Sequence, residues 1–251
     1  MGTLARVARR RTLDARHETL AAADQFRRYK RESRQEVRKA DVKEDETLKA
    51  IKLAWLRLCE DYVGDIETPY ARAVELVHNL EYSARDVESF SLMLSELQTA
   101  HSSSHYDGLF LSALINMSKE DTYIVHTVGL NRPLNFLGYE NVKNIIVNGD
   151  VGLRLGNGMK QGTININGNA GSCLGERMAG GRITVNGETG DVLGGPCGNR
   201  GGEIHLNGNF GQPSYAHISS DIYHNGKLIH SVNSWPMLSC QDYWHHKFWM
   251  K

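Results

Sequence analysis

The chain has 251 residues, and its 29 Lys and Arg residues balance 29 Asp and Glu residues, so the formal net charge is zero. This length is enough for one or two domains with a buried core. No apolar run approaches the roughly 20 residues that a membrane-spanning helix needs, so we expect no membrane partner. Residues 1–11 are rich in arginine but contain no apolar signal core, and the four cysteines form no C-x-x-C pair. We therefore expect a cytoplasmic protein without cofactor or metal.

Residues 1–46 are predicted to be a basic arm or helix. Within residues 1–40, twelve Lys or Arg residues stand against five acidic ones, and no Pro or Gly interrupts residues 12–50. Clustered arginines favour phosphate or carboxylate groups, in nucleic acid, a ribonucleoprotein or an acidic protein surface. A solvated helix or a frayed arm without a partner is the alternative. The candidate partner-binding residues are Arg9, Arg10, Arg11, Arg27, Arg28, Arg31 and Arg34.

Residues 47–120 are predicted to form a small helical domain. From Leu48 to Tyr62, apolar residues recur at spacings of three and four, which places one apolar stripe on a helix that ends near Gly64.

Further helices follow in the same domain. Thr68 and Pro69 predict the start of a second helix, with Thr68 as its N-cap. Ser83 is expected to cap a third helix, with Asp86 in its first turn. Leu109–Met117 is apolar enough to be a fourth, largely buried helix.

Residues 121–228 are predicted to form a parallel β-helix, because a tandem repeat runs from about Asn141 to Gly226. In each copy two apolar residues flank a variable one, and Asn-Gly follows. The copies are Ile145–Gly149, Ile164–Gly168, Ile183–Gly187 and Ile204–Gly208, with a worn fifth copy, Ile222–Gly226. A fixed period of about 20 residues marks a solenoid, in which each unit buries its apolar face against its neighbours.

Alternation of apolar and variable residues is typical of a half-buried strand. The inward column is expected to be Ile145, Val147, Ile164, Ile166, Ile183, Val185, Ile204 and Leu206, and the outward column Ile146, Asn165, Thr184, His205 and Tyr223. Asn-Gly tolerates positive φ and lets the chain turn sharply. Asn-Gly is also a hairpin signal, but the constant phase of the copies favours parallel coils. We expect four to five coils, a leading coil from Thr122, and stacked Asn side chains at the turns.

The repeat also carries a family resemblance. Gly168–Gly171 and Leu174–Gly181 resemble the Gly-x-x-x-Gly-x-Gly repeat domain found in the C-terminal part of the glutamate synthase large subunit and in the C subunit of formylmethanofuran dehydrogenase. The resemblance covers about residues 139–228 and weakens at Pro196-Cys197. It implies a right-handed parallel β-helix with a structural role. Together with the helical pattern of the preceding residues, this predicts an α+β chain, in which a helical N-terminal part is followed by a short right-handed parallel β-helix. It does not imply the chemistry of the synthase, because an N-terminal cysteine nucleophile and a flavin barrel have no counterpart here.

Residues 229–251 form an aromatic tail, predicted to be an end cap or a partner contact because a solenoid needs its open end covered. Cys240, His245 and His246 could bind a metal ion, but adjacent ligands in a tail more often bind one adventitiously. We expect no catalytic, cofactor-binding or metal-binding residues.

The sequence therefore predicts a non-catalytic scaffold or interaction protein, a β-helix platform within a larger assembly of protein subunits, and an oligomer is compatible with it. The alternative is a nucleic-acid or ribonucleoprotein-associated protein that binds through residues 1–40. A third reading is an enzyme with a site in the groove between helices and solenoid, where polar groups with strongly shifted pKa values would converge.

Overall fold

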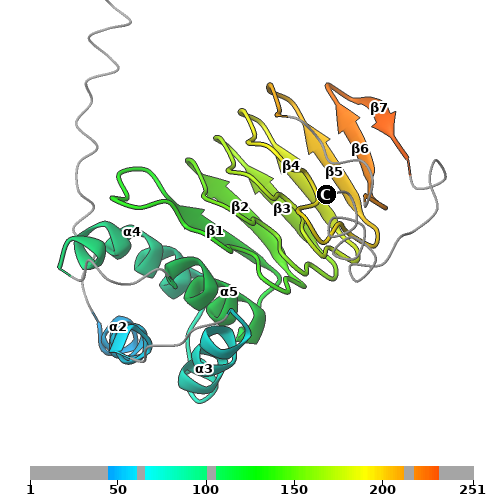
Figure 1. Cartoon of the computed structure of the whole chain (residues 1–251). Coiled ribbons are helices and arrows are strands. Elements are labelled where there is room, and N and C mark those ends of the chain that lie inside the picture. The colour runs from blue at the N-terminus through cyan, green and yellow to red at the C-terminus, as the bar shows by residue number, and fades with distance from the viewer. Residues whose placement is uncertain (1–44, 61–65, 101–105, 212–217, 232–251) are drawn as a thin grey trace, which may run out of the picture. The chain divides into compact units, whose positions relative to one another are not determined.

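The computed structural model of the chain describes residues 45–60, 66–100, 106–211 and 218–231. The chain divides into two units, Met1–Asp41 and Val42–Lys251, and the first lies outside the described residues. Within the described residues four helices precede seven strands, and the strands form one sheet in chain order (Figure 1). The predicted α+β fold is confirmed, with helices followed by a parallel β-solenoid of about five turns. The right-handed sense of the coil stays a prediction.

The first helix confirms the predicted apolar stripe. The helices are α2 (Glu46–Glu60), α3 (Glu67–Val77), α4 (Ala84–Ala100) and α5 (Asp107–Met117). In α2 the residues at most 2% exposed are Leu48, Ile51, Trp55 and Leu58. Their spacing puts them on one face of the helix. This face packs into the core because removing its apolar surface from water is favourable. Tyr62 and Gly64, expected to complete this helix, lie outside the described residues.

The two predicted helix starts have different outcomes. At α4 the prediction is confirmed, because the Ser83 hydroxyl accepts the backbone N–H of Asp86 at 3.4 Å and the backbone N–H of Ser83 donates to the Asp86 carboxylate at 2.8 Å. At α3 it is wrong, because the N-cap is Ile66 and makes no side-chain capping bond. Thr68 and Pro69 therefore lie inside the first turn. Pro69 fits there because proline lacks a backbone N–H, and the first N–H groups of a helix have no intrahelical acceptor.

The repeat forms parallel coils, as predicted. The strands are β1 (Thr122–His126), β2 (Asn144–Asn148), β3 (Thr163–Ile166), β4 (Arg182–Val185), β5 (Glu203–Leu206), β6 (Asp221–His224) and β7 (Lys227–His230). Neighbours from β1 to β6 pair in parallel, each copy in register with the next. The eight residues of the inward column are at most 1% exposed, and the outward column is half-buried. This confirms the predicted phase.

The fifth Asn-Gly turn corrects the sequence reading. β6 and β7 pair antiparallel, and the chain turns between them at Asn225 and Gly226, whose φ angles are +49° and +75°. Two left-handed residues in a row are the geometry of a tight hairpin turn. The prediction of a parallel coil is therefore correct for the first four Asn-Gly pairs and wrong for the turn after β6.

At three of the Asn-Gly pairs between parallel strands, those of Gly168, Gly187 and Gly208, glycine is required by close approach and not by positive φ. Gly168 and Gly187 do not have the left-handed φ expected of them. A Cβ on Gly187 would lie only 2.5 Å from the carbonyl oxygen of Gly168, one coil earlier. The glycine column thus lets the backbones of neighbouring coils stack without a side chain between them.

Helices α4 and α5 satisfy backbone groups of the first coil. The Ser91 hydroxyl on α4 accepts the backbone N–H of His126 in β1 at 3.0 Å. On α5, the Asn116 amide donates to the carbonyl oxygen of Tyr139 at 3.0 Å and accepts from the N–H of Val142 at 3.3 Å. These bonds cover groups that an open sheet edge would leave unpaired.

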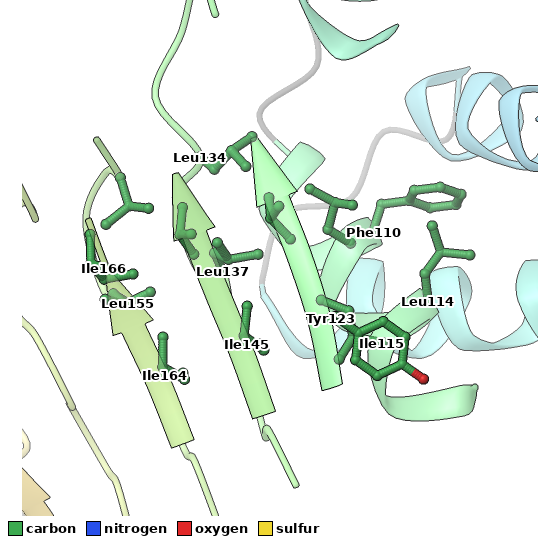
Figure 2. Packing of buried hydrophobic residues seen from close by; sticks show 14 of the residues in the cluster. Phe110, Leu114, Ile115, Tyr123, Leu134, Leu137, Ile145, Leu155, Ile164 and Ile166 are labelled. Carbon is green, nitrogen blue, oxygen red and sulfur yellow. The ribbon is translucent and has the colours of Figure 1, made fainter. Parts of the chain in front are cut away.

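One hydrophobic core runs from α2 through α5 into the solenoid. Figure 2 shows Phe110, Leu114 and Ile115 of α5 beside Tyr123 of β1, and the solenoid residues Ile145 and Ile164 continue the same apolar row. The helices and the coils therefore bury their apolar surface together.

Candidate functional site

The outward face of the sheet is a regular surface built from one side chain per coil. Its half-buried middle column runs Ile146, Asn165, Thr184, His205 and Tyr223. The rings of His205 and Tyr223 stack with centroids 4.4 Å apart and planes 10° apart. The His205 side chain, expected to point to solvent, is 25% exposed. The column therefore ends at β5 and β6 in an aromatic pair.

An ion cluster flanks this column. The Glu203 carboxylate accepts from the Arg182 guanidinium at 2.8 Å and lies 2.9 Å from Nε2 of His205. The hydrogen bond with His205 and then that with Arg182 lower the pKa of Glu203 below its usual value of 4.5. These contacts fix the three side chains relative to one another on the surface.

The predicted Asn ladder forms at the ends of the strands. Asn167, Asn186 and Asn207 each donate to the side-chain oxygen of the Asn one coil earlier, at 3.1, 3.0 and 2.8 Å. Asn225 contacts His224 instead. The ladder thus spans the four parallel copies and stops where the hairpin begins.

A groove of about 450 Å³ lies between α3 and the turns of the solenoid. It is lined by Glu67, Tyr70, Tyr139, Glu140, Asn157, Gly158, Lys160, Arg177, Ala179 and Arg200. This is the groove between helices and solenoid in which the third reading of the sequence placed an enzyme site. None of these residues was predicted from the sequence to be a site residue, because residues more than a hundred positions apart meet only after folding.

Two tyrosines form the aromatic wall of the groove. The rings of Tyr70 and Tyr139 lie 4.7 Å apart at 54°, and the Asn116 amide donates to the Tyr70 hydroxyl at 2.9 Å. Burial raises the pKa of Tyr70, while its hydrogen bond with Asn116 acts in the opposite direction and the charge of Glu140 adds to the rise. The phenol is therefore harder to ionise than a free one.

The rim of the groove carries three cationic and two acidic side chains. Lys160 lies 3.0 Å from the carboxylate of Glu140, and Arg177 lies 3.7 Å from that of Glu67. The side chain of Arg200 is exposed and makes no hydrogen bond or ion pair with any other residue that the structure describes. All four paired side chains are at least 41% exposed, so each pair contributes little to stability.

A buried carboxylate lies behind the groove. Glu176 is 3% exposed, and its oxygen accepts from the Asn157 amide at 3.1 Å and lies 3.3 Å from the Arg154 guanidinium. These contacts satisfy the charge of Glu176 inside the turns. They also hold Asn157, which faces the groove.

The sequence-predicted partner residues lie elsewhere. Arg9, Arg10, Arg11, Arg27, Arg28, Arg31 and Arg34 are all outside the described residues, as are Cys240, His245 and His246. The predicted start of the tail, at residue 229, falls within β7. Across the parts of the chain that the structure describes, no group of three or more His, Cys, Asp or Glu residues is placed to hold a metal ion. None of the helices described there has the length and apolarity to cross a membrane.

Comparisons with protein-family models, with curated proteins and with solved structures gave no match to this chain.

Proposed function

We propose that this protein is a non-catalytic scaffold, whose β-solenoid is a platform for other protein subunits in a larger assembly. The outward sheet face supports this proposal. It presents one half-buried side chain per coil in register, above an inward column that is at most 1% exposed. Because each coil is bonded to the next along its whole strand, the surface keeps its shape without a ligand. Its aromatic end at Tyr223 has the residue type that is enriched at protein interfaces.

Photo-crosslinking in the native host tests the platform. A small diazirine-bearing amino acid at Thr184 or Arg182 would report on the sheet face, and the same group at Leu53, which is 55% exposed on α2, would serve as the control. The proposal predicts adducts with the same protein from both sheet positions and none from Leu53. Absence of adducts at the sheet positions, or equal adducts at all three, would refute it.

The family relation is part of the same proposal. We infer that the coils are a Gly-x-x-x-Gly-x-Gly repeat domain like that of the glutamate synthase large subunit, with the same structural role. The glycines that stack coil on coil support this inference, as the close approach of Gly187 and Gly168 illustrates. A cytoplasmic location, expected from the sequence, belongs to the proposal as well.

A second candidate function is nucleic-acid or ribonucleoprotein binding through residues 1–40. Twelve basic against five acidic residues favour it. Affinity for RNA or DNA should then fall steeply with salt, because released counterions drive such binding. A chain that starts at Asp41 should lose this affinity and keep its thermal midpoint within a few degrees, since the arm holds few large apolar residues. Unchanged affinity in the shortened chain would contradict this candidate.

An enzyme with a site in the groove is the third candidate. It calls for converging polar groups with strongly shifted pKa values. In the groove, burial raises the pKa of Tyr70. A tyrosine shifted in this direction is a poorer proton donor.

A further inference from the structure

We propose that the groove between α3 and the solenoid binds a small organic anion, whose carboxylate or phosphate group lies against Arg200 and Arg177. This inference goes beyond the scaffold role and does not depend on it. The groove volume of about 450 Å³ falls in the range of about 300–1,000 Å³ that small-molecule sites occupy.

The charges of the groove favour an anion. Lys160, Arg177 and Arg200 come from three successive coils and face two carboxylates, Glu67 and Glu140. Glu140 is close to Lys160 at 3.0 Å, whereas Glu67 is 3.7 Å from Arg177, too far for a hydrogen bond. Arg200 has no carboxylate partner among the described residues. An anion on Arg200 would therefore displace no group of the protein.

The backbone sets the two arginines next to each other. The N–H of Arg177 donates to the carbonyl oxygen of Gly198 at 2.6 Å, and the N–H of Arg200 donates to that of Met178 at 2.7 Å. The two side chains therefore start from neighbouring, directly bonded segments. Each guanidinium is a planar fork that binds a carboxylate or phosphate through two parallel hydrogen bonds.

The aromatic wall supplies the place for the carbon skeleton of the ligand. Asn116 holds the Tyr70 hydroxyl at 2.9 Å and the carbonyl oxygen of Tyr139 at 3.0 Å, so both tyrosines are fixed before a ligand arrives. A preorganised wall costs a ligand little ordering of the protein. The class of ligand that fits is a small molecule with one anionic group and an apolar or aromatic part.

Benzoate and phenyl phosphate are suitable probes, because they share a ring and differ in the anionic group. Benzamide is the neutral control. Titration of the full chain, followed by calorimetry or ligand-detected NMR, should show binding of at least one anion and at least tenfold weaker binding of benzamide. The better of the two anions identifies carboxylate or phosphate as the group recognised. Raising the salt concentration should weaken the binding, since the arginines are half-exposed.

Three variants separate the groove from general charge effects. Arg200→Ala should lower the affinity about ten- to hundredfold, as expected for the loss of a charged hydrogen-bond partner. Arg182→Ala removes the same charge from the sheet face, outside the groove, and should leave the affinity unchanged. Glu67→Gln should raise the affinity, because it removes the carboxylate nearest Arg177.

Two results would overturn the proposal. One is the absence of binding by either anion at concentrations up to roughly 10 mM, because a dissociation constant above that value means very weak binding. The other is an equal loss of affinity in Arg200→Ala and Arg182→Ala. Thermal melts of the two arginine variants serve to check that each is folded, as we expect because both arginines are exposed.

Discussion

Gly156 and Ile183 test the stacking of the coils, because each limits the other across neighbouring coils. Gly156 has a φ of +66°, and a Cβ added there would lie 2.5 Å from Cδ1 of Ile183. Gly156→Ala should therefore cost about 1–2 kcal/mol for a left-handed alanine, and about 1–3 kcal/mol more for overpacking. Ile183→Val removes the Cδ1 atom from a side chain that is 0% exposed, and should cost about 0.5–1.5 kcal/mol on its own.

The double variant gives the decisive value. Since valine makes room for the new methyl group, Gly156→Ala combined with Ile183→Val should be about 1–3 kcal/mol more stable than the sum of the single changes. Urea denaturation of the four proteins measures this coupling. Additive effects within about 0.5 kcal/mol would refute the packing described here, because they would mean that the two residues do not meet.

The remaining predictions concern the two faces of the sheet. Val185→Asp should unfold the protein at room temperature, because it buries an unpaired charge at a residue that is 0% exposed. Thr184→Asp on the outward face should leave a folded protein with a slightly lower thermal midpoint. Similar effects of the two variants in thermal melts would show that the inward phase is wrong. Asn186→Ala removes two links of the Asn ladder and should cost about 1 kcal/mol in urea denaturation; an unchanged denaturation midpoint would show that the ladder adds no stability. Glu203 has a lowered pKa in the folded protein, so its contribution to stability is present above its usual value of 4.5 and is lost as the pH falls below it. Glu203→Gln should therefore flatten the fall of the thermal midpoint below pH 4.5, and an unaltered acid profile would contradict this.

The coils were predictable because their signal is repeated. Each copy places the same apolar pair around a variable residue, so Ile166 and Val185 could be assigned to the core from their shared phase. The apolar stripe of α2 was predictable for a similar reason, since residues such as Ile51 and Trp55 recur at helical spacing. Local periodicity carries this information without any long-range contact.

The turns were harder to predict because one dipeptide serves two geometries. Asn186-Gly187 continues a parallel coil, whereas Asn225-Gly226 makes a hairpin with both φ angles positive. The difference depends on the next segment, which for Asn225 is the strand Lys227–His230. The start of α3 was missed because Thr68-Pro69 is compatible with several positions in the first turn.

A groove between the helices and the solenoid was part of the enzyme reading, but the residues that line it could not be predicted from the sequence. It brings Tyr70 of α3 together with Tyr139 and Arg200 of the solenoid, and none of these residues belongs to a motif. Their meeting depends on how α3 and α5 pack against the first coil, as the bond from Asn116 to Tyr70 shows. Such a site follows from tertiary packing, and its residues form no periodic pattern in the sequence.

The proposed contact between the outward face of the solenoid and a partner protein can be tested on the native complex. The most direct measurement is the native mass of the complex that the full chain forms in its host, compared with that of the double variant Asn165→Arg and Thr184→Arg. Both positions are half-buried on the outward face, so the variant should fold while two added charges block the contact. The account predicts a complex with the unaltered chain and the mass of the free protein with the variant. A complex of unchanged mass from a folded variant would contradict it.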